Sequence, residues 1–228
     1  PFNVFLKMNT GMNRLGFKPE AYRLAFHRLH AAGYRMHHMT HFANADQVGQ
    51  EPSVGGQQEL FNQTISGLPG STSLANSAAI LWHRNALGDW VRPGIMLYGA
   101  SPTGLFADIE HSHLKAVMRL SSEIIDIQEL KKGDRVGYGG RYEAQEPMRI
   151  GIVACGYADG YPRHAPNGTP IAVAGKMTQT LGRVSMDMLF VDITAIPEAE
   201  IGAYVEMWGN QVSVDDVAHS AETISYEL

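Results

Sequence analysis

Residues 4–33, VFLKMNTGMNRLGFKPEAYRLAFHRLHAAG, contain one strand, one loop and one helix in that order. The apolar run 4–8 predicts a strand. Pro19 is a residue type favoured in the first turn of a helix, and Gly33 is typical of a residue that follows a helix end. Between them, apolar side chains recur at helical spacing: Tyr22, Leu24, Ala25, Phe26, Leu29 and Ala32. This order is typical of a unit in a parallel α/β sheet.

The same rhythm continues to about residue 100. We expect strands at 36–42, 73–75 and 95–98, with helices at 57–66 and 77–85 between them. A complete (β/α)8 barrel takes about 250 residues, so four strands in about 100 residues correspond to half of one. The sequence therefore predicts the C-terminal half of a TIM barrel over residues 1–106, with the other strands upstream.

From residue 107 to residue 228 the helical pattern gives way to short β-rich runs separated by turns. We expect strands at 117–127, 149–154, 171–174, 188–193 and 204–208. The fold class is thus α/β followed by all-β, with a β-barrel-like second domain over residues 107–228.

The charge and hydropathy of the sequence limit the kinds of partner that it could bind. The chain has 228 residues and a net charge of -5, and no dense Lys/Arg run that would indicate nucleic acid or an anionic membrane. No apolar stretch approaches the roughly 18 residues of a membrane span. Cys155 is the single cysteine, which excludes an intrachain disulfide framework and favours a reducing, cytoplasmic setting. Small-molecule chemistry fits best.

Charged residues follow the first two predicted strands. Lys7 and Arg14 lie where the first strand gives way to its loop, and His41 closes the second strand. Barrel enzymes carry their reactive groups at the C-terminal ends of the strands. These side chains are candidates for a carboxylate-binding site, although solvated loop charges and an ordinary core histidine are the alternatives.

Two later junctions favour a phosphate. Asn76 or Ser77 stands at a predicted helix start, where unpaired N–H groups and the helix dipole attract anions. One unit later, Arg92 precedes Gly94 and Ile95, and a glycine lets the backbone approach a phosphate closely. A plain helix cap is the simpler alternative for the first junction.

In the β-rich half, tyrosines lie on glycine-rich turns. Tyr138 belongs to Gly137-Tyr138-Gly139-Gly140, and Tyr157 opens a similar turn nineteen residues later. Such tyrosines often only cover a core. Their occurrence together with the barrel-mouth residues is the informative feature.

Taken in order from Leu6 to Tyr226, these segments resemble the alanine racemase family. The resemblance implies an N-terminal barrel that binds pyridoxal 5'-phosphate, a C-terminal β domain that carries the catalytic tyrosine, and a homodimer with shared active sites. It also implies interconversion of L- and D-alanine through a pyridoxal phosphate aldimine by two-base proton transfer. No metal is implied.

By this resemblance Tyr138 is the catalytic base for one face of the substrate, supported by His41 and Arg92. Arg14 and the main chain of Met186 match positions near the substrate carboxylate, and Lys7 matches a position that is often carbamylated. The cofactor-binding positions are His41, Ser77, Arg92, Gly94, Ile95 and Tyr226. The positions that match the entrance corridor are Tyr157, Arg163, Arg183 and Asp187.

The sequence departs from the family pattern in two respects. No residue matches the Schiff-base lysine, which lies on the first barrel strand in the family, so this chain alone is expected to be inactive. Asn9 stands where many relatives have aspartate. Two alternatives stay open: a serine or broader-specificity racemase of the same family, and a barrel protein that binds pyridoxal phosphate without catalysis.

Overall fold

The computed structural model describes residues 2–228 and divides into two compact units. The first ends at Met96, and the second comprises Leu97–Leu228. The sequence had suggested a boundary between residues 106 and 107, so the segment from Leu97 to Phe106 packs with the second unit instead of the first.

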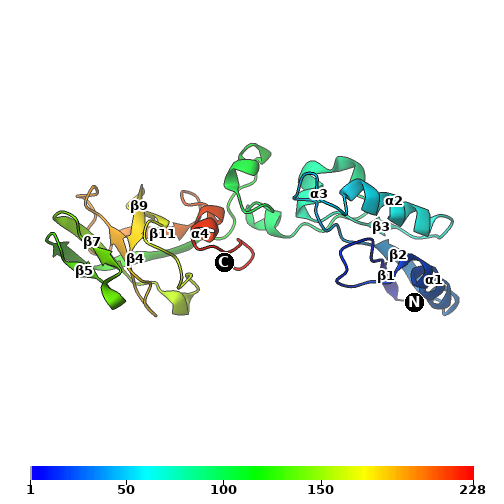
Figure 1. Cartoon of the computed structure of the whole chain (residues 1–228), viewed down its shortest axis with the longest axis horizontal. Helices are drawn as coiled ribbons and strands as arrows, with labels where there is room; N and C mark the ends of the chain where they lie inside the picture. The colour runs from blue at the N-terminus through cyan, green and yellow to red at the C-terminus, as the bar shows by residue number, and fades with distance from the viewer. Residues whose placement is uncertain (1) are drawn as a thin grey trace. The chain divides into compact units, whose positions relative to one another are not determined.

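The first unit is a parallel sheet with helices (Figure 1). Its strands β1 (Asn3–Lys7), β2 (Arg35–Met39) and β3 (Thr72–Ser73) are hydrogen-bonded in the order β1-β2-β3. The helices that follow them in turn are α1 (Pro19–Ala31), α2 (Val54–Ile65) and α3 (Ser77–Trp82). This is the βαβα order expected for part of a barrel.

The first core forms because strand residues alternate between faces. Leu6 and Met36 are buried on one face of the sheet, where Tyr22 and Phe26 of α1 are buried with them. Leu24, which the sequence placed in the apolar stripe, is 74% exposed. The buried apolar face of α1 is therefore narrower than the apolar stripe predicted from the sequence.

The expected strand at 95–98 is wrong. Ile95–Tyr98 forms a 3-10 turn, η2, and only Ile95 of its four residues is buried. A run of four apolar residues carries no period that distinguishes a strand from a helical turn. The expected helix at 77–85 is also divided, because α3 ends at Trp82 and a separate 3-10 turn, η1, covers Arg84–Ala86.

The second unit contains a closed six-stranded barrel with the strand order β10-β7-β4-β11-β8-β9. All its pairs are antiparallel, and β9 pairs with β10 to close it. The strands are β4 (Leu120–Leu130), β7 (Met148–Val153), β8 (Pro170–Val173), β9 (Lys176–Leu181), β10 (Leu189–Asp192) and β11 (Tyr204–Trp208).

Shorter elements decorate this barrel. A hairpin of β5 (Arg135–Val136) and β6 (Tyr142–Glu143) follows β4, and helix α4 (Val214–Ser220) follows β11. Four 3-10 turns complete the unit: η3 (Phe106–Asp108), η4 (Glu110–Ser112), η5 (Tyr138–Gly140) and η6 (Tyr157–Asp159). The sequence did not predict β9, because its residues KMTQTL are largely polar, nor did it predict α4.

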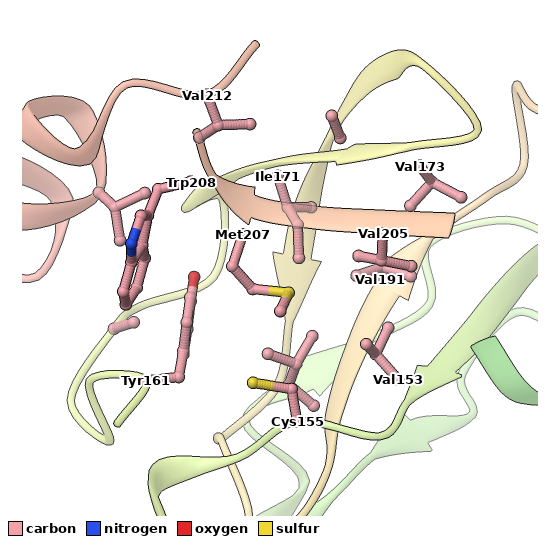
Figure 2. Close-up of a cluster of buried hydrophobic side chains, with 14 of the residues drawn as sticks. Val153, Cys155, Tyr161, Ile171, Val173, Val191, Val205, Met207, Trp208 and Val212 are labelled. Atoms are coloured by element: carbon pink, nitrogen blue, oxygen red, sulfur yellow. The ribbon is translucent and has the colours of Figure 1, made fainter. Parts of the chain in front are cut away.

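Inward-pointing side chains fill the barrel (Figure 2). Val153, Ile171, Val173, Val191 and Val205 are each fully buried. Burial of one such side chain contributes about 1.5–3 kcal/mol, so this cluster is a large part of what keeps the barrel closed. None of the helices in residues 2–228 has both the length and the apolarity that a membrane crossing requires.

Candidate active site

Arg92 is the centre of the site in the first unit. Its Nη1 donates to Ser73 Oγ at 2.6 Å, and its Nη2 donates to the carbonyl oxygens of Thr40 at 2.8 Å and Leu74 at 3.2 Å. Nη2 also lies 3.3 Å from Nδ1 of His41. The guanidinium fork thus ties the end of β3 to the end of β2, at the edge of the sheet where barrel enzymes place their reactive groups.

The contact with Arg92 fixes the state of His41. A guanidinium only donates, so His41 Nδ1 must accept and the ring must carry its proton on Nε2. Burial, and after it the nearby positive charges of Arg92, Arg14 and Lys7, together lower the pKa of His41 to about 4. At neutral pH His41 is therefore an uncharged ring beside a permanent cation.

The loop after β1 brings Lys7 and Arg14 to the same place. It folds back on itself through hydrogen bonds between Asn9 N–H and Phe17 O and between Phe17 N–H and Lys7 O, both 2.9 Å. Gly16 has a φ of +112°, and a side chain there would meet the backbone of residues 7–9 at 2.9 Å. Burial, with Arg14 and Arg92, lowers the pKa of Lys7.

The phosphate-binding candidates also converge. Asn76 caps α3 by accepting from Ala79 N–H at 3.0 Å, so the cap is Asn76 and Ser77 is the first helical residue. Ser77 is buried, and its hydroxyl oxygen accepts from Gly94 N–H at 2.8 Å. That bond leaves the Ser77 O–H as a donor. With Arg92, it offers hydrogen-bond donors that an anion such as a phosphate could accept.

In the second unit, Tyr138 lies on the turn between β5 and β6 and is 71% exposed. Gly137, Gly139 and Gly140 have φ values of 67°, 74° and 54°, a region that glycine adopts without strain. The ion pair of Arg135 with Glu143, at 2.9 Å, joins the two strands below the turn. The sequence expectation of a tyrosine on a glycine-rich turn is confirmed.

The loop 182–188 contacts both this hairpin and the turn that contains Tyr157. A side chain at Gly182 would meet Val136 O at 3.2 Å, so the loop lies directly against β5. At its other end Tyr157 N–H donates to Ser185 O at 3.0 Å, and Ala158 N–H donates to Met186 O at 2.9 Å.

The Met186 carbonyl is therefore occupied by a backbone donor, while its side chain is 54% exposed. The guanidinium carbon of Arg163 lies 5.7 Å from the centre of the Tyr157 ring. This stacking places two of the four proposed corridor residues together. Arg183 and Asp187 lie in the same 182–188 loop, half-buried and exposed respectively.

Tyr226 follows α4 and is 59% exposed. The segment before it is anchored by the fully buried Asp215, whose carboxylate accepts from Ser225 Oγ and, at 2.9 Å, from Ser101 N–H. Burial raises the pKa of Asp215. The sequence did not identify Asp215, because an acidic residue in the first turn of a helix is usually only favourable to the helix dipole.

The predicted site residues thus form two groups, one in each unit. Lys7, Arg14, His41, Ser77, Arg92, Gly94 and Ile95 belong to the first, and Tyr138, Tyr157, Arg163, Arg183, Met186, Asp187 and Tyr226 to the second. Sequence reasoning missed Thr40, Ser73 and Gln57, which hold the first group in place. They are polar residues in buried positions, which a pattern of hydrophobicity assigns to the surface.

Comparisons with known proteins agree with this architecture. The family model described as "Alanine racemase, N-terminal domain" matches residues 1–102, and "Alanine racemase, C-terminal domain" matches residues 117–228. An alanine racemase of Ralstonia nicotianae is 54% identical over 234 residues, which cover 100% of this chain and 62% of that protein. The chain therefore spans about three-fifths of the length of its curated relatives.

Solved structures show the same likeness. The biosynthetic alanine racemase of Pseudomonas aeruginosa superimposes with a TM-score of 0.92 at 47% identity, covering 100% of this chain and 63% of the other. An alanine racemase of Bartonella henselae, solved with covalently bound pyridoxal phosphate, gives a TM-score of 0.84 at 28% identity, and the match covers 99% of this chain and 62% of the other. Both family domains, the sheet and the barrel agree in one conclusion: the chain belongs to the alanine racemase family.

Proposed function

We propose that the full-length protein containing this chain interconverts L- and D-alanine with pyridoxal 5'-phosphate as cofactor. The observation that carries the proposal is the arrangement around Arg92, where a fixed cation, a neutral His41 and the Ser77 hydroxyl lie at one end of a parallel sheet. The donor set fits the cofactor, and it occurs in a chain whose relatives are named alanine racemases.

Arg92, His41, Ser77, Gly94, Ile95 and Tyr226 would hold the cofactor. When bound, pyridoxal phosphate withdraws electrons from the amino-acid Cα and makes its proton removable. The protein must then bind the carboxylate, exchange a proton on each face of Cα and control access to the site.

Arg14 and the main chain of Met186 would bind the carboxylate, and Tyr138 would exchange the proton on one face. The glycine residues beside it would let the Tyr138 hydroxyl approach the substrate closely. The corridor residues Tyr157, Arg163, Arg183 and Asp187 would limit the size of the amino acid that enters, since a bulky ring and a stacked guanidinium leave little room.

The base for the other face would be the family's lysine, which no residue of this chain matches. We therefore expect this chain by itself to be inactive. We further propose a homodimer in which each active site combines the barrel of one protomer with the tyrosine of its partner.

Turnover of alanine, serine and lysine by the full-length protein tests the function directly. We expect alanine to be racemised with the highest kcat/KM. Higher turnover of serine or lysine would instead favour the broader-specificity alternative, and cofactor binding without racemisation of any of the three would favour the non-catalytic one.

A further inference from the structure

Gln57 of α2 is a polar residue, but it is almost completely buried, with 1% of its surface exposed. Burying an amide costs free energy unless its polar atoms are hydrogen-bonded. Gln57 makes bonds from both ends of that amide. Its Nε2 donates to Thr10 Oγ1 at 2.9 Å and to His41 O at 3.2 Å, and its Oε1 accepts from Ala43 N–H at 2.8 Å.

These partners belong to the two loops that carry the site. Thr10 lies in the loop after β1, between Lys7 and Arg14, whereas His41 and Ala43 lie in the segment after β2. The Thr10 hydroxyl is in turn 2.7 Å from the Thr40 hydroxyl. One buried side chain therefore connects both loops.

The network continues to the guanidinium. Thr40 Oγ1 donates to Met8 O at 3.0 Å, and the Thr40 carbonyl accepts from Arg92 at 2.8 Å. His41, whose backbone carbonyl is held by Gln57, contacts Arg92 through its ring. The position of the His41 ring relative to Arg92 thus depends on the backbone that Gln57 holds.

From this connectivity we propose that Gln57 is the positioning residue that fixes His41 and, through the Thr40–His41 strand end, Arg92. The proposal rests on the function proposed above. Replacing the amide by an apolar chain leaves His41 O and Ala43 N–H without their partner. Because unpaired polar groups inside a protein are costly, this backbone must move toward water and take the His41 ring with it.

The test compares Gln57→Met with Gln58→Met in the full-length protein. Methionine keeps the length of glutamine and removes its hydrogen bonds. Gln58 is the matched control, because it is the next residue of the same helix and its one side-chain bond goes to Asn85 O, away from both loops. With cofactor bound, we expect Gln57→Met to lower kcat at least about tenfold while KM for alanine changes less than about threefold. Gln58→Met should behave like the wild type.

A second readout needs neither cofactor nor activity. The cofactor-free proteins are labelled with 13C at histidine Cε1, and the His41 signal is assigned by its loss in His41→Gln. In the wild type and in Gln58→Met, His41 should stay neutral through the ordinary histidine range of about pH 6–7. In Gln57→Met the ring moves into water and away from the charges of Arg92, Arg14 and Lys7, so it should titrate within that range.

A lower melting temperature alone would not produce this titration, so the signal separates positioning from general stability. If Gln57→Met does not fold, Gln57→Asn, whose shorter side chain draws the amide away from His41 O and Ala43 N–H, is measured in its place with the same expectations. An unchanged kcat and an unchanged His41 titration in an active protein would overturn the proposal. If the wild type racemises no amino acid, the proposed function fails, and the His41 titration still decides whether Gln57 positions that ring.

Discussion

Lys7 lies where the positive charge of its ammonium group is unfavourable. It is partly buried near Arg14 and Arg92, and together with burial these cations lower the pKa of its ammonium group. A neutral amine can attack CO2 and lose a proton to form a carbamate anion. That anion would attract Arg14 instead of repelling it.

We therefore predict that Lys7 is carbamylated in the full-length protein at neutral pH with bicarbonate present. With 13C-labelled bicarbonate, the wild type should show a carbamate carbon signal that is missing in Lys7→Ala and retained in Lys18→Ala, a control in the same loop. A wild type that lacks the signal at saturating bicarbonate would contradict the assignment.

His41 gives a prediction for stability. Its pKa in the folded protein is lowered to about 4 from an unfolded value of 6.5, so the unfolded chain binds more protons between these values. The free energy of unfolding should therefore fall as pH decreases from about 6.5 to about 4, and this contribution should be constant above and below that window.

Urea unfolding at a series of pH values measures this dependence. In His41→Gln the slope across the window should be smaller than in the wild type. Equal slopes in the wild type and in His41→Gln would show that His41 titrates normally in the folded state.

At the scale of elements, the tightest approach in the candidate site lies between the η6 turn and the loop 182–188. A side chain at Gly156 would meet Met186 O at 2.3 Å and Ser185 O at 2.4 Å, while no heavy atom lies within 4 Å of one at Gly160. Backbone oxygens on a hydrogen-bonded loop cannot rotate aside as a flexible side chain can.

We predict that Gly156→Ala lowers the free energy of unfolding by about 2 kcal/mol or more, because the two segments must separate. Gly160→Ala should lower it by about 1 kcal/mol, since only the strain of its positive φ remains. Chemical denaturation of both variants checks the order. If Gly160→Ala proves the more destabilised, the close approach at Gly156 is not what holds the loop.

Helices and strands in which apolar residues recur at a regular spacing could be predicted from the sequence, and those without such a spacing could not. Pro19 and the spacing of Tyr22 and Phe26 predicted α1, whose observed bounds are Pro19–Ala31. The expected strand at 204–208 also coincides with β11. In contrast, β9 alternates little in hydrophobicity, and η2 is a turn of four apolar residues that has no period.

Among the residues of the candidate site, some could likewise be predicted from the sequence and others could not. The residues Tyr138, His41 and Arg92 could be proposed because their types and neighbours resemble those of a known family. Gln57 and Asp215 could not, because both are polar residues in helices whose burial depends on contacts with segments far away in sequence. Long-range hydrogen bonds leave no local pattern.

At the scale of the whole molecule, we propose that two protomers together form each active site. Full-length Tyr138→Phe and a full-length variant without the family's cofactor-binding lysine should each be nearly inactive, because each site lacks one of the two bases. Unfolding and refolding them together in equal amounts should restore about a quarter of all sites, since half of the dimers are mixed and each has one intact site. Differentially tagged heterodimers without activity above the parents would contradict shared sites.

We propose that Tyr138 exchanges the proton on one face of the amino acid. Exchange of the Cα hydrogen with solvent deuterium, measured separately for L- and D-alanine with the full-length protein, tests it most directly. In Tyr138→Phe we expect exchange of one enantiomer to fall at least about a hundredfold while the other still exchanges, because the second base remains. Tyr204→Phe, at an exposed tyrosine of β11, should behave like the wild type. Wild-type exchange of both enantiomers by Tyr138→Phe would contradict the claim.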